Sequence, residues 1–314
     1  MLFLGSLPKP FFALAPMDDV TDTVFRQVIA DCARPDLFFT EFINVDGLQS
    51  PGRAKLLKKL KFSAQEKPII AQIWGLKPDN FYKIAKELVD MGFDGIDLNF
   101  GCPEKAVVKN GACIALMNNR ELAVEIIKAT QVGVAGQVPV SIKTRLGFND
   151  IDLSWHELLL KQKLDMLTIH GRTRQEKSKV PAHWDKIGEI RQMRDRLAPD
   201  TSIVGNGDVL NRQQGLELAK LYKLDGIMIG RGVFNDPFVF TEHSPWSNYS
   251  REQRIGLYKK HVKLFAETWL DGERPLNTLN KFCKIYINGF DGAKEQREQL
   301  MQARSTDELL AQLN

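Results

Sequence analysis

Cysteine is scarce in this chain, which has four cysteines (Cys32, Cys102, Cys113 and Cys283) among 314 residues. They lie far apart, they form no C-x-x-C pair, and the five histidines do not cluster with them. This pattern excludes a disulfide framework and indicates no zinc site. We therefore expect no metal and a reducing, cytoplasmic setting. Long apolar runs are also missing, because none approaches the ~18 residues that span a membrane.

A strong excess of one charge is absent as well. The formal net charge of +4 permits a nucleic-acid partner but does not require one. The N-terminal stretch MLFLGSLPKPFFALAPM is apolar, but it lacks a basic beginning and is interrupted by prolines and a lysine. We therefore expect no export signal. With 43% apolar residues, the chain can bury a sizeable core.

The chain does contain a regular alternation of short apolar runs and helical patterns. The runs are FFALAPM, LFFTEFI, PIIAQIWG, GIDLNFG, PVSIKTRLG, MLTIHGR, TSIVGNGD and GIMIGRGV. Segments between them, such as DNFYKIAKELVDMG and NRELAVEIIKAT, carry apolar residues at helical spacing. This alternation predicts an α/β fold, a parallel (β/α)8 TIM barrel over residues 1–240. A doubly wound open sheet is the alternative.

The pattern changes after Phe240, where the turn-rich EHSPWSNYS is followed by no further strand-like alternation. Ser250 with Gln253 and Ser305 with Glu308 fit capping boxes, and glycine and proline mark breaks between helices. We expect a small all-helical C-terminal domain of about four helices over residues 241–314.

Polar side chains alternate with apolar ones along three consecutive runs. One face of these runs carries Asp97, Asn99, Ser141, Lys143, Arg145, Thr168, His170 and Arg172. Because helices cover the outside of a barrel, this face should point into its interior. Charged groups buried there without partners would cost several kcal/mol each. The sequence therefore predicts either an internal ion-pair network or a polar ligand site at the carboxyl ends of the strands.

Glycine-rich turns end the last two runs. Asn206, Gly207 and Asp208 follow the seventh run, and Gly230 and Arg231 follow the eighth. Backbone N–H groups in such turns can approach a phosphate closely, and these two loops form the usual phosphate site of a (β/α)8 barrel. The alternative is a pair of ordinary tight turns.

Eight motifs, in order along the chain, resemble those of the tRNA-dihydrouridine synthases, flavoenzymes that reduce specific uridines of tRNA. The motifs are LAPMDDVTDTVFR, TEF, QIWG, DLNFGCP, SIKTRLG, IHGRTR, GNGD and MIGRG, which span roughly residues 13 to 233. The resemblance implies that Cys102 is the catalytic cysteine. It also implies that FMN is held by Pro16, Met17, Gln72, Lys143, His170, Asn206, Gly207, Asp208, Gly230 and Arg231.

The implied reaction adds a hydride to C6 and a proton to C5 of uracil. By the resemblance, reduced FMN supplies the hydride, NADPH re-reduces FMN, and Cys102 donates the proton. An ordinary thiol, with a pKa of about 8.5, is mostly protonated at neutral pH and suits that role. Lys143 would stabilise negative charge on the flavin unless it pairs with Asp97. Cys113, in an apolar run, is expected to serve packing.

The expected partner is tRNA, and we expect the protein to be a monomer. The target uridine would have to be flipped out of the folded RNA to reach the site. Residues expected at the substrate are Asn99, Lys105, Arg145, Arg172 and Arg174. Two other functions fit the same residues. One is a dihydroorotate dehydrogenase-like flavoprotein acting on a free pyrimidine, and the other is a catalytically inactive tRNA-binding protein.

Overall fold

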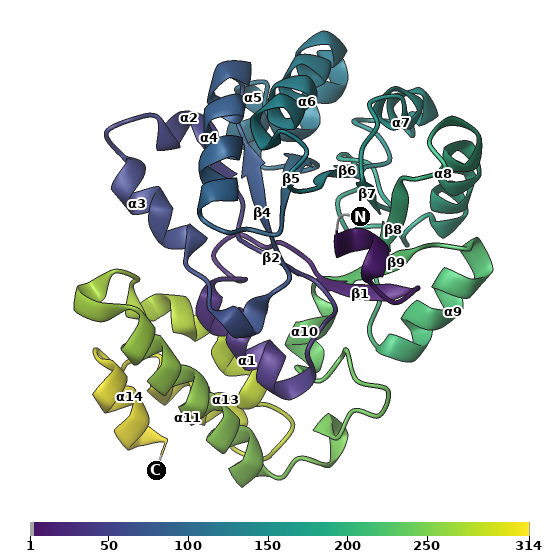
Figure 1. The fold of residues 1–314 in the computed structure, drawn as a ribbon. Helices are drawn as coiled ribbons and strands as arrows, with labels where there is room; N and C mark the ends of the chain where they lie inside the picture. The colour runs from purple at the N-terminus through teal and green to yellow at the C-terminus, as the bar shows by residue number, and fades with distance from the viewer. Residues whose placement is uncertain (1–2, 314) are drawn as a thin grey trace.

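Parallel strands form a nearly closed barrel in the computed structural model, with helices between them (Figure 1). The structure describes residues 3–313, apart from the side chain of residue 271. The strands are β1 (Phe11–Leu14), β2 (Phe38–Phe39), β3 (Ile43–Asn44), β4 (Ile69–Trp74), β5 (Gly95–Phe100), β6 (Val140–Arg145), β7 (Met166–His170), β8 (Ser202–Asn206) and β9 (Gly226–Ile229). The (β/α)8 barrel expected from the sequence is confirmed.

The strands follow the order β1-β9-β8-β7-β6-β5-β4-β2, and all of these pairings are parallel. The two ends of this order come together at a parallel bridge between Ala13 and Leu37. There the Leu14 N–H donates to the Leu37 carbonyl at 3.1 Å. The carboxyl ends of the strands therefore converge on one end of the barrel, where this fold places its active site.

The second predicted strand, LFFTEFI, is interrupted, and its two parts, β2 and β3, both pair with β4. At the interruption the Thr40 hydroxyl, instead of a backbone carbonyl, accepts a hydrogen bond from the Gln72 N–H at 3.0 Å. The same hydroxyl donates to the Glu41 carbonyl at 2.7 Å. A side chain thus replaces the backbone ladder where the strand breaks.

Helices follow the strands and surround them (Figure 1). Those of the barrel region are α1 (Thr23–Ala33), α2 (Val45–Leu48), α3 (Arg53–Leu57), α4 (Pro78–Asp90), α5 (Lys105–Lys109), α6 (Arg120–Val134), α7 (Leu153–Leu160), α8 (Trp184–Leu197), α9 (Arg212–Tyr222) and α10 (Gly232–Asn235). The residues at the N-terminus of a helix determine where it begins, as two examples show. Helix α4 begins with a proline, and the Asn119 side chain caps α6 by accepting from the Leu122 N–H.

The C-terminal segment is helical, as expected, and contains α11 (Arg251–Thr268), α12 (Asn280–Tyr286), α13 (Ala293–Leu300) and α14 (Thr306–Gln312). The predicted capping box at Ser250 and Gln253 is present at the start of α11. Helix α11 packs against α1, and α12 and α14 pack against α11 (Figure 1). The Phe25 ring of α1 stacks on the Phe282 ring of α12, with the centroids 4.8 Å apart. The boundary at residue 240 stays a prediction, and residues 1, 2 and 314 of the two predicted domains lie outside the described range.

None of the helices within residues 3–313 combines the length and the apolar character that crossing a bilayer requires.

Candidate functional site

The register of the strands gathers the polar residues of the barrel interior into layers. Paired positions on adjacent strands form one layer of Asn99, Lys143 and Thr168 and a second, closer to the carboxyl ends, of Arg145, His170 and Asn206. Residues that the sequence separates widely therefore lie side by side, as the two-residue period of a strand predicts.

A cavity of about 850 Å³ opens at this end of the barrel. Its volume lies within the range of small-molecule sites. Apart from Gln72, all of the residues expected to hold FMN line it, namely Pro16, Met17, Lys143, His170, Asn206, Gly207, Asp208, Gly230 and Arg231. Arg145, expected at the substrate, lines it as well.

Lys143 reaches this cavity without a hydrogen-bond or ion-pair partner among the described residues. The alternative pair with Asp97 forms no hydrogen bond or salt bridge, because the Asp97 carboxylate accepts from Ser141 and from Gln72, both at 2.6 Å, and Asp97 acts on Lys143 only through its charge. Burial first, and the nearby Arg145 second, lower the pKa of Lys143 to about 8. An unpaired ammonium in this setting can stabilise negative charge on a bound ligand.

His170 lines the same cavity as a neutral imidazole. Burial, followed by the positive charges of Arg145 and Lys143, holds its pKa well below the ordinary range. A neutral imidazole can both donate and accept a hydrogen bond, whereas the protonated form can only donate.

Arg172, expected at the substrate, is 2% exposed and bonds within the protein. Its Nε donates to the Val180 carbonyl at 2.5 Å, and its Nη2 pairs with Asp208. Asp208 also accepts from the Ala182 N–H at 3.1 Å and lies 3.3 Å from Arg231. In this arrangement Arg172 fixes the loop after β8, and Arg231 is the more exposed cation at the cavity.

Gly207 in that loop has a φ of +141°, and a Cβ there would lie 2.7 Å from the Ala182 side chain. Only glycine fits this position without a shift of the backbone. The loop expected to approach a phosphate thus has both the backbone conformation and the close packing that require glycine.

Gln72 and Asn99 belong to a buried network that supports the cysteine loop. Asn99 Nδ2 donates to the Gln72 amide oxygen at 3.0 Å, and Asn99 Oδ1 accepts from the backbone N–H groups of Gly101 at 3.1 Å and Cys102 at 2.9 Å. The amide nitrogen and the amide oxygen of Asn99 are therefore both engaged in hydrogen bonds within the protein. Its predicted contact with the substrate and that of Gln72 with FMN stay predictions.

Cys102 lines a second cavity, of about 600 Å³. The other lining residues are Asp18, Phe42, Asn44, Leu56, Lys59, Trp74, Pro103, Glu104, Lys105, Val107 and Lys177. Arg145 links the two cavities, because it lines the first and its Nε donates to the carbonyl of Gly101, next to Cys102, at 2.9 Å. Lys143 is also close enough to the Cys102 sulfur for their charges to interact.

The Cys102 thiol differs from the ordinary thiol that the sequence suggested. A hydrogen bond from the Cys113 thiol, opposed by burial and assisted by the Glu104 N–H, lowers the pKa of Cys102 to about 7. Cys113 is buried, as expected of a packing residue, but it also contacts the cysteine at the site. Sequence reasoning missed this contact, since nothing in the apolar run around Cys113 indicates where its sulfur points.

Two further residues expected at the substrate differ in position. Lys105 is exposed and lines the Cys102 cavity. Arg174 instead lies over the Phe148 ring, with its guanidinium carbon 4.5 Å from the ring centroid. Its Nε is buried and has no hydrogen-bond partner in the described part of the chain.

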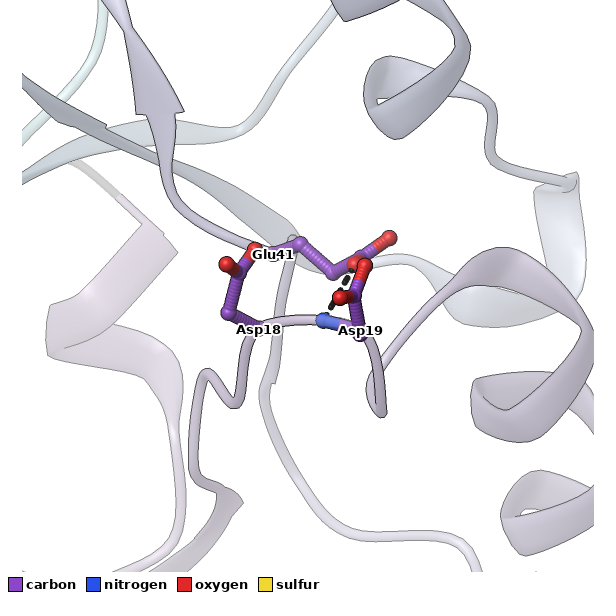
Figure 2. Close-up of side chains that lie close together, drawn as sticks. All are labelled: Asp18, Asp19 and Glu41. Carbon is purple, nitrogen blue, oxygen red and sulfur yellow. Dashed lines mark hydrogen bonds between the residues drawn. The ribbon is translucent and has the colours of Figure 1, made fainter. Parts of the chain in front are cut away.

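Three carboxylates, Asp18, Asp19 and Glu41, lie close together (Figure 2), and Asp18 lines the Cys102 cavity. Glu41 Oε1 accepts from the Asp19 N–H at 2.7 Å. Lys59 pairs with Asp18, and Arg274 of the C-terminal segment lies 3.1 Å from Glu41. Side-chain cations thus balance this acidic group and join it to the C-terminal segment.

Comparison with known proteins identifies the family of this chain. The chain matches the model of the dihydrouridine synthase family over residues 13–314. It is 47% identical over 316 aligned positions to a probable tRNA-dihydrouridine synthase 2 of Bacillus subtilis, covering 99% of this chain and 95% of that protein. It is 48% identical to a probable tRNA-dihydrouridine synthase of Staphylococcus epidermidis, covering 98% of this chain and 93% of that protein.

Among solved structures, morphinone reductase in complex with tetrahydroNAD superposes with a TM-score of 0.52 at 14% identity. The match covers 78% of this chain and 91% of that structure. At this identity the likeness supports the barrel fold alone.

Proposed function

Because this chain belongs to the dihydrouridine synthase family, we propose that it reduces the C5–C6 double bond of specific uridines in tRNA, with FMN as bound cofactor and NADPH as reductant. The observation that carries the proposal is the unpaired Lys143 ammonium in a cavity next to the one that holds Cys102. Family membership argues against the dihydroorotate dehydrogenase-like alternative.

The residues of the larger cavity fit a flavin mononucleotide. Lys143 leaves a cation free for the edge of the flavin ring that becomes negative on reduction, and His170 and Asn206 offer further polar groups nearby. In the same cavity, the glycine turns after β8 and β9 and the exposed Arg231 suit a phosphate. The cavity is large enough and carries the positive charge that an anionic cofactor needs.

In the proposed reaction, bound FMN in its reduced form supplies the hydride for C6 of uracil. Cys102 donates the proton for C5, and a pKa of about 7 places its thiol close to the working pH, where a general acid is most effective. Lys143 stabilises negative charge at the flavin edge. Arg145 holds the Gly101 carbonyl and thereby fixes the loop that carries Cys102.

The RNA partner is supported by the exposed lysines at the Cys102 cavity. Lys105, at the start of α5, and Lys177, in the turn after β7, line it and are exposed. A uridine swung out of the tRNA loses stacking and pairing, and contacts between lysines and phosphates offset part of that cost. Action on tRNA places the protein in the cytoplasm, and we expect it to act as a monomer.

The deciding experiment deletes the gene and maps dihydrouridine across the cellular tRNAs by mass spectrometry of nuclease fragments. We expect dihydrouridine to disappear from particular positions, to return with the wild-type gene and to stay absent with Cys102→Ala. The purified protein should be yellow and release FMN on denaturation. An unchanged dihydrouridine map with a colourless protein would favour an inactive tRNA-binding protein, and turnover of dihydroorotate without action on tRNA would favour the free-pyrimidine alternative.

A further inference from the structure

Two cysteines on either side of the short helix α5 meet through their side chains. The Cys113 thiol donates a hydrogen bond to the Cys102 sulfur, and the Cys102 backbone N–H faces the Cys113 sulfur in return. Cys102 lines the cavity, whereas Cys113 is 1% exposed and lies behind it at the start of the 3-10 helix Cys113–Asn118. The pair thus consists of one accessible thiol and one enclosed thiol.

The backbone at Cys113 shows that its position is imposed by the surrounding fold. Its φ is +53°, in the left-handed region that residues other than glycine seldom adopt. The residues that follow it, Ile114 and Leu116, are buried in the core. The backbone that carries the Cys113 side chain is therefore held beside Cys102 by the packing of the residues that follow it.

We infer that Cys113 is a positioning residue for the reaction, one that orients the Cys102 sulfur and stabilises the thiolate left when Cys102 gives its proton to the substrate. The inference rests on the proposed function. In the proton transfer, the S–H bond of Cys102 breaks, a C–H bond forms at C5, and the electron pair of the S–H bond stays on sulfur. A thiol that already donates to this sulfur stabilises the developing charge without rearrangement.

The remaining groups around Cys102 act on its sulfur in other ways. The nearby carboxylates Asp18 and Glu104 disfavour a thiolate, and the Glu104 N–H is the other donor to the sulfur. The cations that interact with the sulfur from β6 or line its cavity are Lys59, Lys105, Lys143, Arg145 and Lys177. Lys59 is paired with Asp18, and Lys105 and Lys177 are exposed to solvent. Lys143 and Arg145 are partly buried and favour the thiolate through their charge, whereas Cys113 is the enclosed side chain that donates a hydrogen bond to the sulfur.

The test measures the protonation of Cys102 directly. The full-length enzyme loaded with FMN is alkylated with iodoacetamide over a range of pH, and peptide mass spectrometry follows the modification of Cys102. Cys113→Ala removes the donor, and we expect the midpoint of the alkylation profile to rise by about one pH unit, so that the thiolate fraction at pH 7 falls roughly fivefold. Cys113→Ser keeps a donor of nearly the same size, so its midpoint should stay closer to that of the wild type.

Cys113→Gly provides a second variant without a donor, and it suits the positive φ at this position if the alanine variant fails to fold. Cys283→Ala is the matched control. It truncates another buried cysteine, whose partner is Tyr258 in the C-terminal segment, and the Cys102 midpoint should not change. A midpoint that is the same in the wild type, Cys113→Ser and the donor-free variants would overturn the inference.

Dihydrouridine formation in tRNA is measured on the same preparations, so the two proposals can fail separately. If the wild-type enzyme forms no dihydrouridine, the proposed function fails, and the inferred role of Cys113 in the reaction fails with it. If the wild type forms dihydrouridine but the midpoint does not move, only the role of Cys113 fails. With both correct, the rate of single-turnover reduction in Cys113→Ala should follow the shifted midpoint, and Cys113→Ser should restore the pH profile.

Discussion

Arg274 in the C-terminal segment lies against Glu41 in the barrel, with its Nη1 3.1 Å from Oε2 of the carboxylate. The Glu41 side chain is fully buried, and that of Arg274 is 10% exposed. Arg274 Nε also lies 3.2 Å from Asp22. The acidic group in Figure 2 therefore depends on a cation from a distant part of the chain, and it includes Asp18, which lines the Cys102 cavity.

Replacing Arg274 should destabilise the whole protein. Arg274→Ala leaves the carboxylates of Glu41 and Asp22 buried without their main cation, so we expect the free energy of unfolding to fall by about 3 kcal/mol or more. Urea unfolding followed by circular dichroism measures the change. Affinity for tRNA should fall as well, because the C-terminal segment loses an anchor to the barrel.

Lys260→Ala is the control for this prediction. Lys260 also joins the C-terminal segment to the barrel, through a pair with Asp31 at 2.8 Å, but both side chains are more than a third exposed. Solvent screens such a pair, so the loss should stay below about 1 kcal/mol. Equal effects of the two substitutions would show that the burial of the Arg274 pair does not increase its contribution to the free energy of unfolding.

Flavin binding should depend on the charge of Lys143. Lys143→Met removes an ammonium that the described residues leave unpaired, and we expect affinity for reduced FMN to fall roughly 10- to 100-fold. Fluorescence titration of the apoprotein under reducing conditions measures this. Lys128→Met, on the exposed outer side of α6, is the control and should bind as the wild type does.

The pH dependence of that affinity follows from the lowered pKa of Lys143. Burial places this pKa at about 8, so the amine is charged below about pH 8 and neutral above it. Affinity for reduced FMN should therefore decline as the pH rises through this value in the wild type, with no corresponding decline in Lys143→Met. A decline of the same size in both proteins would assign it to another group.

Cys102→Ala should separate binding from chemistry. We expect FMN to stay bound and to be reduced by NADPH at the wild-type rate, while single-turnover reduction of uridine slows by roughly 10² or more, the range for a lost general acid. Cys32→Ala, a cysteine on α1 outside both cavities, is the matched control. Unchanged single-turnover reduction in Cys102→Ala would remove Cys102 from the mechanism.

The sequence predicted the barrel and most of the larger cavity because both depend on short-range periodicity. The two-residue period of a strand places Lys143 and Arg145 on the inner face, and parallel register then sets His170 beside Arg145. The glycine-rich sequences GNGD and MIGRG also predicted the turns after β8 and β9. These features need no knowledge of how distant loops fold.

The remaining features depend on contacts between residues far apart in the sequence, which the periodicity of strands and helices does not predict. Arg172 has the inward position that alternation predicts, yet its guanidinium bonds to the loops that carry Val180 and Asp208. The pairing of Arg274 with Glu41 likewise depends on how the C-terminal segment packs against the barrel. Such contacts are set by tertiary packing, which local sequence does not encode.

Phosphate contacts should make tRNA binding sensitive to salt. If lysines at the Cys102 cavity neutralise phosphates, the logarithm of the tRNA affinity should fall linearly and steeply with the logarithm of salt concentration. The double substitution Lys105→Ala and Lys177→Ala should weaken binding and reduce the slope by about one per lysine in contact. Lys128→Ala with Lys220→Ala, on the outer helices α6 and α9, removes the same charge away from both cavities and should leave the slope unchanged. A flat dependence on salt in the wild type would refute phosphate-driven binding. A slope that drops equally in both double variants would show that net charge, rather than this cavity, attracts the RNA.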